Sequence, residues 1–374
     1  MSIPHKQYSI QQQGLQTVPR SVRAIRNAFV ADALAMPAHW YYRRTDIRKD
    51  FPDGFKQFHP APARHPGAIM SLHSKRHGGR QGSQANNVPE VVGNVILKGK
   101  AHLWDQSGIH YHHDMQAGEN TLNAHTVLWM FDAIRAAGQQ YDESIFLNHY
   151  IQQMTADPAN HPDTYAESYH RGFFAHLAAG RAAHQCAAVT HDTPSIGGLV
   201  RIGPLALWAM ETGHSLVEIK SMAALHLKLT HPDNQLIRVC FQYLDLLHDL
   251  WQSDDLESRQ TLLRKVLMQV AGKHFKRRPA ASWADDQVIG GLYSSACYIS
   301  DSWPGILYLA NKYPEDTLTA LQVNTELGGD NVHRGFVLAT ILAMVNGQEL
   351  DDLYQQLTCR SSLDQILEDL KLLS

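Results

Sequence analysis

An all-α fold, built as a single large globular, non-solenoid helical domain, is predicted for this chain from three features. Segments rich in Ala, Leu, Met and Gln, with apolar residues at helical spacing, follow one another through most of the sequence. No long segment alternates apolar and polar residues as a half-buried strand does. No repeat with a period of roughly 20 to 50 residues indicates a solenoid.

One domain is expected because no low-complexity run or Gly/Ser/Pro-rich linker divides the 374 residues. Residues 1–20 are polar and Gln-rich and are predicted to form a flexible N-terminal arm, which leaves residues 21–374 for the helical domain. Hydrophobic residues make up 44% of the chain and charged residues 18%. That composition supplies a large core and carries too little charge for a disordered chain.

The first helix is predicted where Val22, Ile25 and Phe29 recur at helical spacing. Residues 51–87 show little periodicity, and a loop of that length is usually functional or partly disordered. Residues 333–345 (HRGFVLATILAMV) have almost no polar face, which predicts a helix at the centre of the molecule. Other helices are expected at residues 120–137, 144–155, 165–179, 202–212, 216–229, 234–252, 256–271 and 287–300.

The charge balance excludes a protein that attracts nucleic acid or anionic lipid by a global positive field, since 33 Lys and Arg face 36 Asp and Glu. No leading apolar segment and no run of about 18 apolar residues is present. We therefore expect a cytoplasmic protein that binds neither nucleic acid nor a membrane, and the oligomeric state stays open. The cysteines form no C-x-x-C pair and are expected to be reduced: Cys186, Cys240, Cys297 and Cys359.

Asp32 is the first candidate for chemistry. Its spacing from Ile25 and Phe29 places the carboxylate on the apolar stripe of the first helix. A buried carboxylate is costly unless it is hydrogen-bonded or bound to a cation. An Asp that braces a neighbouring helix is the favoured interpretation from this residue alone.

A polar face opens the helix predicted from residue 120. Glu119 and Asn123 stand four residues apart and Asn120 and Asn123 three apart, so one face presents a carboxylate and two amides. Capping and the helix dipole explain a carboxylate at a helix start. On a largely apolar helix, however, a carboxylate and two amides on one face are more typical of residues that line a polar cavity than of surface residues.

A Gly-Gly turn leads into the apolar helix. Gly328 and Gly329 let the backbone approach a ligand closely, and free N–H groups in the first helical turn attract phosphate or carboxylate oxygens. Asp330, His333 and Arg334 would share one side of that turn. An Asp N-cap after a glycine turn explains Asp330. It does not explain why His333 and Arg334 stand in the first turn of a helix that is predicted to be buried.

Two further segments have both a structural and a ligand-binding interpretation. Arg201 stands in an apolar run, either as a buried ion-pair partner or as an anion clamp. Thr230 and His231 follow a predicted helix end, where they either cap the helix or line a pocket. Each segment by itself favours the structural role.

The order and spacing of these segments resemble the ADP-ribosylglycohydrolase family, from about residue 22 to residue 347. Residues 31–39 (ADALAMPAH) are similar to the family's G-D-A-L-G-x-P-x-E, and residues 118–121 (GENT) fall where it has T-D-D-T. Residues 328–333 (GGDNVH) resemble its closing G-G-D-T-D-T. Residues 199–204 (LVRIGP) and 229–233 (LTHPD) are similar to its M-R-x-x-P and S/T-H segments.

This resemblance implies an all-α globule whose central cleft holds two magnesium ions, which orient an ADP-ribose group for cleavage at its distal ribose. The chain departs from the family pattern at that metal site. Val332 cannot ligate a metal, His333 stands at a Thr position, and His39 replaces the Glu that some members use in catalysis.

Magnesium prefers hard oxygen ligands in octahedral geometry. The matched positions retain few such ligands, so at most one magnesium ion is expected. Glu119 and Asp330 would hold it, with Asp32 as a further candidate ligand.

The leading hypothesis is a hydrolase that cleaves an N- or O-glycosidic bond of a small-molecule or ADP-ribosylated substrate, with zero or one metal ion. Such a reaction needs one group to activate water and another to assist the leaving group. Glu119 or Asp330 is the expected base, and His333 the proton donor or orienting group. Substrate contacts are expected from Asn120, Asn123, Arg201, His231, Gly328, Gly329, Asn331 and Arg334, with Arg334 or Arg201 at a phosphate.

Two alternatives remain open. A catalytically inactive protein that binds ADP-ribose or a nucleotide sugar, or has a structural role, could keep the fold after losing metal ligands. The His-rich run is also a candidate site for zinc, because alternate residues of an extended segment share one face. The residues of that run are His102, His110, His112, His113 and Asp114.

Overall fold

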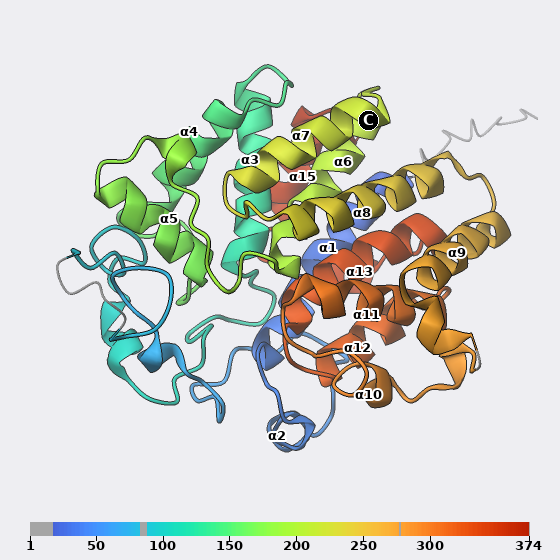
Figure 1. The fold of residues 1–374 in the computed structure, drawn as a ribbon, viewed down its shortest axis with the longest axis horizontal. Coiled ribbons are helices and arrows are strands. Elements are labelled where there is room, and N and C mark those ends of the chain that lie inside the picture. Colours follow the sequence, from blue (N-terminus) through green and yellow to red (C-terminus); the bar gives the residue numbers. More distant parts are fainter. Residues whose placement is uncertain (1–17, 83–87, 277, 374) are drawn as a thin grey trace, which may run out of the picture.

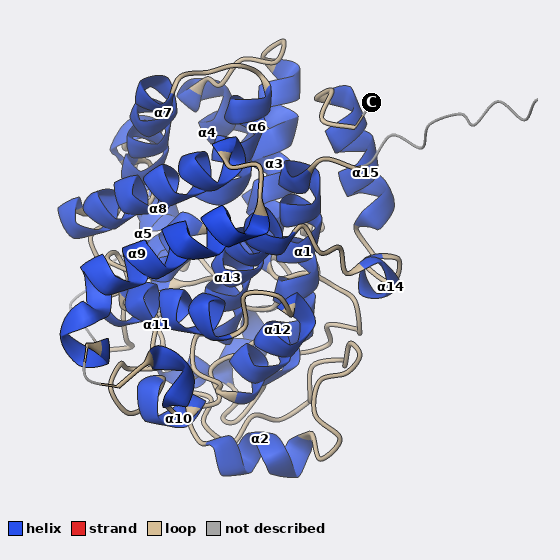
Figure 2. Cartoon of the chain, turned by 90° about the vertical axis from the view of Figure 1, so that its right-hand side faces the viewer, coloured by secondary structure: helices blue, strands red, loops and turns tan. Residues whose placement is uncertain are grey.

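The computed structural model describes residues 18–82, 88–276 and 278–373, and within them the all-α prediction is confirmed. These residues form helices, turns and a few isolated β-bridges, with no named strand (Figure 2). The first seventeen residues of the predicted arm lie outside the described part. Helix α1 already begins at Arg20, which the sequence assigned to the arm.

The helices pack in layers around a central pair (Figure 1). No helix in the described part is both long and apolar enough to cross a membrane. The longer helices are α1 (Arg20–Ala35), α3 (Leu122–Ala136), α4 (Glu143–Met154), α5 (Ser168–Ala178), α6 (Ile202–Glu211), α7 (Leu216–Lys228), α8 (Asn234–Gln252), α9 (Leu256–Phe275), α11 (Ile299–Lys312), α12 (Thr317–Glu326), α13 (Asn331–Asn346) and α15 (Arg360–Asp369). The short helices are α2 (Arg44–Asp50), α10 (Asp285–Val288) and α14 (Asp351–Tyr354).

Helix α13 lies at the centre, as its apolar sequence predicted. All its residues except the last, Asn346, are buried. Helix α1 packs along it, and the rings of Phe29 and Phe336 meet with centroids 5.8 Å apart. Helices α8, α9, α11 and α12 surround this pair (Figures 1 and 2). Because α13 is apolar on every side, it is stable only when neighbours enclose it.

Arg20 ties the start of α1 to the ends of two other helices. Its guanidinium donates to the carbonyl oxygens of Met344 (3.0 Å) and Leu250 (3.3 Å), and to that of Ser253 (2.9 Å). The last carbonyls of a helix have no partner within the helix, so a cation there satisfies them and complements the helix dipole. This one side chain therefore fixes how α1 meets α8 and α13.

The described residues between α2 and α3 form a long irregular segment, with short 3-10 helices at Met70–Leu72 and Ala101–Asp105. Aromatic packing organises it: the ring of Trp104 stacks on that of Tyr165 at 5.1 Å. The segment contributes several side chains to the pocket described below. The described part of residues 51–87 thus contributes to this pocket, which agrees with the functional interpretation of the loop.

The helix predicted at residues 287–300 is wrong. Helix α10 ends at Val288, and α11 begins at Ile299. Gly290 has a φ of +98°, and a Cβ at Gly291 would lie 2.5 Å from the carbonyl oxygen of Gln287. The glycines permit a turn that a helix would not, and the irregular segment delivers Ser295 to the Gly-Gly turn before α13.

Replacing Phe336 with Ala should lower the free energy of unfolding by about 3 to 5 kcal/mol, because it opens a cavity between α1 and α13. Urea denaturation followed by circular dichroism measures this change. Val217→Ala on the exposed face of α7 serves as the control and should change stability by less than about 0.5 kcal/mol. Equal effects of the two substitutions would contradict the central position of α13.

Candidate active site

A cavity of about 320 Å³ lies where the end of α1, the starts of α5 and α13, and the irregular segments meet. Its polar lining includes the carboxylates of Glu167, Asp192 and Asp330. Among the described residues, no Lys or Arg is part of the lining. The aromatic lining consists of Trp40, Tyr42, Tyr111, Tyr165, Tyr169 and Tyr298.

The Gly-Gly turn brings Asp330 into this cavity. Gly328 and Gly329 have φ values of +66° and +65°, and a Cβ on either would collide with the carbonyl oxygens of Tyr41 or Ser295. The turn is pinned on both sides, since Gly329 N donates to Tyr41 O (2.7 Å) and Asp330 N to Ser295 O (2.8 Å). These two N–H groups are therefore occupied, and Gly328 and Gly329, which were expected to contact the substrate, do not line the cavity.

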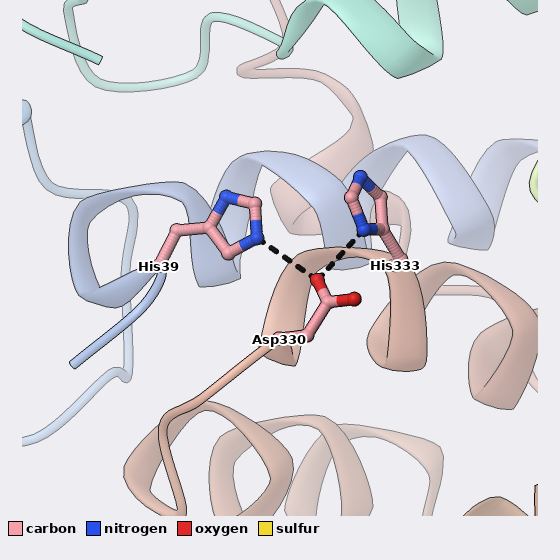
Figure 3. Close-up of side chains that lie close together, drawn as sticks. All are labelled: His39, Asp330 and His333. Atoms are coloured by element: carbon pink, nitrogen blue, oxygen red, sulfur yellow. Dashed lines mark hydrogen bonds and ion pairs between the residues drawn. The ribbon is translucent and has the colours of Figure 1, made fainter. Parts of the chain in front are cut away.

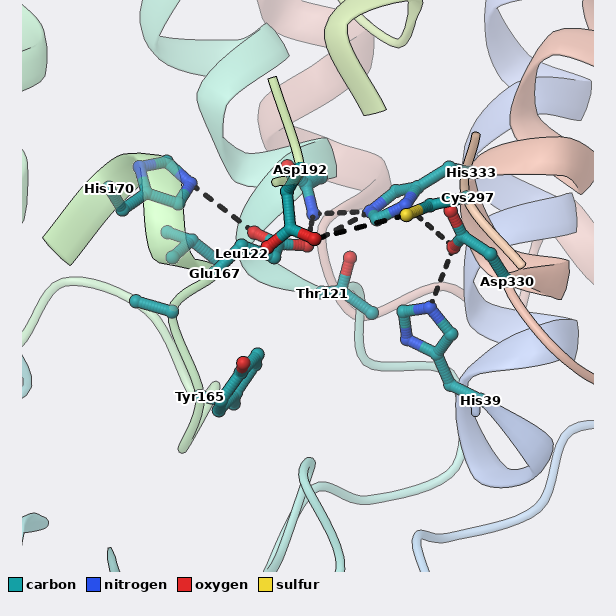
Figure 4. A network of polar contacts seen from close by, with 12 residues as sticks. His39, Thr121, Leu122, Tyr165, Glu167, His170, Asp192, Cys297, Asp330 and His333 are labelled. Atoms are coloured by element: carbon teal, nitrogen blue, oxygen red, sulfur yellow. Dashed lines mark hydrogen bonds and ion pairs between the residues drawn. The ribbon is translucent and has the colours of Figure 1, made fainter. Parts of the chain in front are cut away.

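Asp330 is the centre of a buried polar network (Figures 3 and 4). Its Oδ1 lies 3.0 Å from Nε2 of His39 and 2.7 Å from Nδ1 of His333, while its Oδ2 is buried without a hydrogen-bond partner. Burial by itself would raise the pKa of Asp330, but the two imidazoles bring it well below its usual range. The carboxylate is thus ionised inside the protein.

His333 joins Asp330 to Glu167. Its Nε2 lies 3.2 Å from Oε1 of Glu167 and 2.6 Å from Nδ2 of Asn123, and Asn123 donates to Oε1 of Glu167 (2.8 Å). Burial would lower the pKa of His333, yet Asp330 and Glu167 raise it well above 6.5. His333 is thus an imidazolium between two carboxylates, and their negative charges stabilise its positive charge.

His39 connects Asp330 to a second carboxylate on the other side. Its Nδ1 lies 2.8 Å from Nε2 of His112, whose Nδ1 lies 2.8 Å from Oδ1 of Asp163. Burial lowers the pKa of His39 to about 3, so this ring is neutral. The other oxygen of Asp163 accepts from Leu122 N (2.8 Å) at the start of α3. A continuous chain of polar contacts therefore crosses the interior from α3 to α13.

Trp40 forms one wall of the cavity in a strained conformation. Its φ is +62°, a region that bulky residues rarely adopt. The backbone N–H of Trp40 donates to Gly329 O (2.8 Å), and its indole ring stacks on the imidazole of His39 with centroids 3.7 Å apart. The edges of Tyr111 and Tyr165 complete an aromatic corner. The strain places a flat apolar surface next to the buried carboxylates.

Glu119 does not meet Asp330 across a shared cavity, which corrects the central expectation from the sequence. Its Oε2 accepts from the N–H of Gln116 (2.8 Å), and the residue lines a separate hollow beside α3 and α15. Helix α3 begins only at Leu122, so Glu119 precedes it. The helix start brings Asn123 to the network instead.

Asp32 braces the same helix start. Its carboxylate accepts from Asn120 Nδ2 (2.9 Å), Thr121 N (2.8 Å) and Thr121 Oγ1 (2.7 Å). Burial raises the pKa of Asp32, while these donors act in the opposite direction. The bracing interpretation agrees with these contacts. Neither Asp32 nor Asn120 lines the cavity, so the structure does not bring them to a metal or a substrate there.

The two arginines expected at phosphate are buried behind the walls. Arg201 donates to His226 (2.8 Å), Thr126 (3.1 Å) and Thr230 (2.7 Å). Arg334 donates to the side-chain oxygen of Asn324 (2.7 Å) and to the carbonyl oxygens of Gly328 (2.8 Å) and Ser295 (3.3 Å), and so holds the Gly-Gly turn. Neither lines the cavity, because these structural acceptors already surround both guanidinium groups.

His231 and Asn331 also support the walls. The ring of His231 packs against Tyr169 at 4.1 Å, and its Nδ1 lies 2.9 Å from Thr230 Oγ1. Asn331 donates to the carbonyl oxygens of Ala38 and Thr325, at 3.1 Å each. Their expected role as substrate contacts is corrected to one of positioning the residues that do line the cavity.

Sequence reasoning missed Glu167 and Asp192. Asp192 accepts from Ser168 Oγ and lies 2.8 Å from His191 Nε2. Asp163 and Glu167 flank the start of α5, and this polar cluster before an apolar helix could have indicated a site. Only the fold shows that it faces the Gly-Gly turn.

The His-rich run does not converge on one point. His110 bonds the carbonyl oxygen of Pro37 (3.1 Å), His112 bonds Asp163 and His39, and His102 is exposed on the surface. Over the described ranges, one group of side chains has the spacing of metal ligands: His39, Asp330 and His333.

That donor set does not fit a pair of magnesium ions. Two imidazoles and one carboxylate replace the hard oxygen donors that magnesium prefers. Val332 is fully buried and offers no ligand atom.

Comparison with known proteins identifies the scaffold. A family model described as ADP-ribosylglycohydrolase matches residues 19–374. A solved structure described as an ADP-ribosylglycohydrolase-related protein complex superposes with a TM-score of 0.54 at 14% identity, covering 94% of this chain and 96% of that one. No curated protein matches the chain.

Replacing Asp163 with Asn should destabilise the protein by about 2 to 4 kcal/mol, because it breaks a buried ion pair and removes an acceptor for backbone N–H groups. Burial would raise the pKa of Asp163, but His112 and the N–H donors bring it well below 3.8. This stability is present above about pH 4 and is lost as the pH falls further. Urea denaturation at several pH values tests both statements. The exposed Asp53→Asn is the control, and a pH-independent difference would contradict them.

Proposed function

The chain belongs to the ADP-ribosylglycohydrolase family, and from that premise we propose that its central cavity hydrolyses a glycosidic bond of a ribosyl substrate. The observation that carries the proposal is the joint presence of carboxylates and aromatic walls in one cavity beside the Gly-Gly turn. Hydrolysis through an oxocarbenium-like transition state requires negative charge near the sugar and groups that move protons.

Glu167 is the proposed general base. It lines the cavity, and Asn123 and His333 hold one of its oxygens from behind. A carboxylate oriented in this way is able to take a proton from an attacking water. The ionised Asp330, on the far side of His333, adds the negative charge that stabilises a developing oxocarbenium ion. Asp330 and His333 thus remain in the proposed reaction centre, while Glu167 replaces Glu119.

His191 is the proposed general acid. It lines the mouth of the cavity with its side chain 63% exposed, and its Nε2 contacts Asp192 at 2.8 Å. The hydrogen bond that His191 donates to Asp192 raises the pKa of His191 above 6.5, while partial burial and the charges of Arg171 and Arg80 oppose this shift. A protonated imidazole near neutral pH is suited to donate to a leaving group.

The ribose and a planar group bound to it are the parts of the substrate that the cavity is suited to recognise. Its aromatic rings offer flat surfaces for a base or a similar ring. The two arginines expected at phosphate are held in the walls. We therefore place any phosphate of an ADP-ribosyl substrate toward the open side of the cavity.

Glu167→Gln should lower kcat by about 10²- to 10⁴-fold on any ribosyl substrate that wild type cleaves, because the amide cannot accept the proton. A panel of NAD⁺, nucleosides and ADP-ribosylated peptides, with release of ribose or ADP-ribose measured, provides the assay. The matched control is Glu257→Gln on exposed α9, which should retain full turnover. Unchanged turnover in Glu167→Gln would refute the assignment. Ligand binding without product from any substrate would favour the non-catalytic binding protein instead.

The rate should also depend on pH through His191. Because its pKa is raised, the acid form persists above pH 6.5, and kcat should fall as the pH rises through that pKa. His191→Asn should remove this alkaline limb and lower kcat. The pH profiles of wild type and variant, measured at saturating substrate, test the assignment. An identical alkaline limb in the variant would exclude His191 as the acid.

A further inference from the structure

We propose that His39, Asp330 and His333 bind a single borderline divalent metal ion, with Zn²⁺ as the representative ion, in place of the magnesium pair implied by the family. The ligand atoms are Nε2 of His39, Nδ1 of His333 and a carboxylate oxygen of Asp330, all within 4.8 Å of one another. They come from the end of α1 and the first turn of α13, the most closely packed helix pair of the fold (Figure 3).

The near atoms already have spacings close to those in a metal site. Nε2 of His39 lies 3.0 Å from Asp330 Oδ1, and Nδ1 of His333 lies 2.7 Å from the same oxygen. Two ligands at about 2.0 to 2.1 Å from a tetrahedral zinc ion are about 3.3 Å apart, so each of these contacts would open by a few tenths of an ångström. Small side-chain rotations, with release of the proton from Nδ1 of His333 to water, would admit an ion between them.

The outer nitrogens of both imidazoles have buried partners, and that of His333 is held in the manner typical of metal-binding histidines. Such a residue nearly always engages a carboxylate, a carbonyl or water through its second ring nitrogen. Nε2 of His333 faces Glu167 (3.2 Å), and Nδ1 of His39 reaches Asp163 through His112, in contacts of 2.8 Å each. These outer partners fix which nitrogen of each ring faces Asp330.

A buried atom without a partner supports a missing ligand at this point. Oδ2 of Asp330 is inaccessible and accepts no hydrogen bond from any described residue, although an unsatisfied buried carboxylate oxygen is costly. Asp330 and His333 also line the cavity, so an ion here would have a coordination position open to water or a ligand.

The donor chemistry selects the ion. Imidazole suits zinc, iron, nickel and copper, whereas magnesium selects oxygen donors. Two histidines with one carboxylate are a recurrent set for metal ions that keep open positions. The proposed metal site is independent of the proposed hydrolysis, because its three ligands are the same whichever bond the protein cleaves.

Metal binding by the full, untagged chain tests the proposal directly. Chelator-treated protein is titrated with Zn²⁺ in a calorimeter, its metal content is measured after dialysis, and Co²⁺ substitution is followed by visible absorption. We expect one tightly bound Zn²⁺ per chain, coordinated Co²⁺ bands that Zn²⁺ abolishes, and no competition from millimolar Mg²⁺. Absence of stoichiometric Zn²⁺ binding would overturn the proposal.

Variants locate the ion. The near-isosteric Asp330→Asn and the His39→Gln substitution should each weaken Zn²⁺ binding more than 100-fold, and Glu167→Gln by about 10- to 100-fold through its hold on His333. A double His102→Asn, His113→Asn variant removes the more accessible histidines of the His-rich run and should bind as wild type does. If His39→Gln fails to fold, the Zn²⁺ affinity of Asp330→Asn and the Co²⁺ spectrum of wild type decide whether the ion lies here. Equal loss in the double variant, or none in Asp330→Asn, would place the ion elsewhere.

Discussion

The burial of Asp330 at the start of α13 is the constraint on which the rest of the structure depends. A carboxylate inside a protein must be compensated by donors or cations, and breaking such compensation is strongly destabilising. Helix α13 has no exposed face, so the compensation comes from His333 on the same helix and His39 at the end of α1. The packing of α1 on α13 and the geometry of the site are therefore one arrangement.

The same requirement explains why charged residues that look available in the sequence are unavailable in the fold. Arg334 and Arg201 are buried, and each finds acceptors among neighbouring carbonyl, hydroxyl, amide or imidazole groups. Asp32 is satisfied by the start of α3. What remains at the cavity surface is chiefly aromatic and acidic.

Most of the fold could be predicted because its signals are local. Helical periodicity repeats within a few residues, and a helix apolar on every side can be stable only in the interior. The central position of α13 and the turn at Gly328 and Gly329 followed from that reasoning. The helix predicted at residues 287–300 failed because the glycines there permit a turn, which is held by backbone hydrogen bonds from Leu292 N to Gln287 O and from Tyr293 N to Val288 O.

The site was only partly accessible to such reasoning. Asp330 and His333 are one helical turn apart, so the sequence alone predicts that they lie close together. Glu119 and Asn123 are both polar, and which of them reaches His333 and Glu167 depends on where α3 starts. That start is fixed by Asp32 and other partners far away in the chain, because a helix terminus takes whatever donors and acceptors the packed neighbours provide.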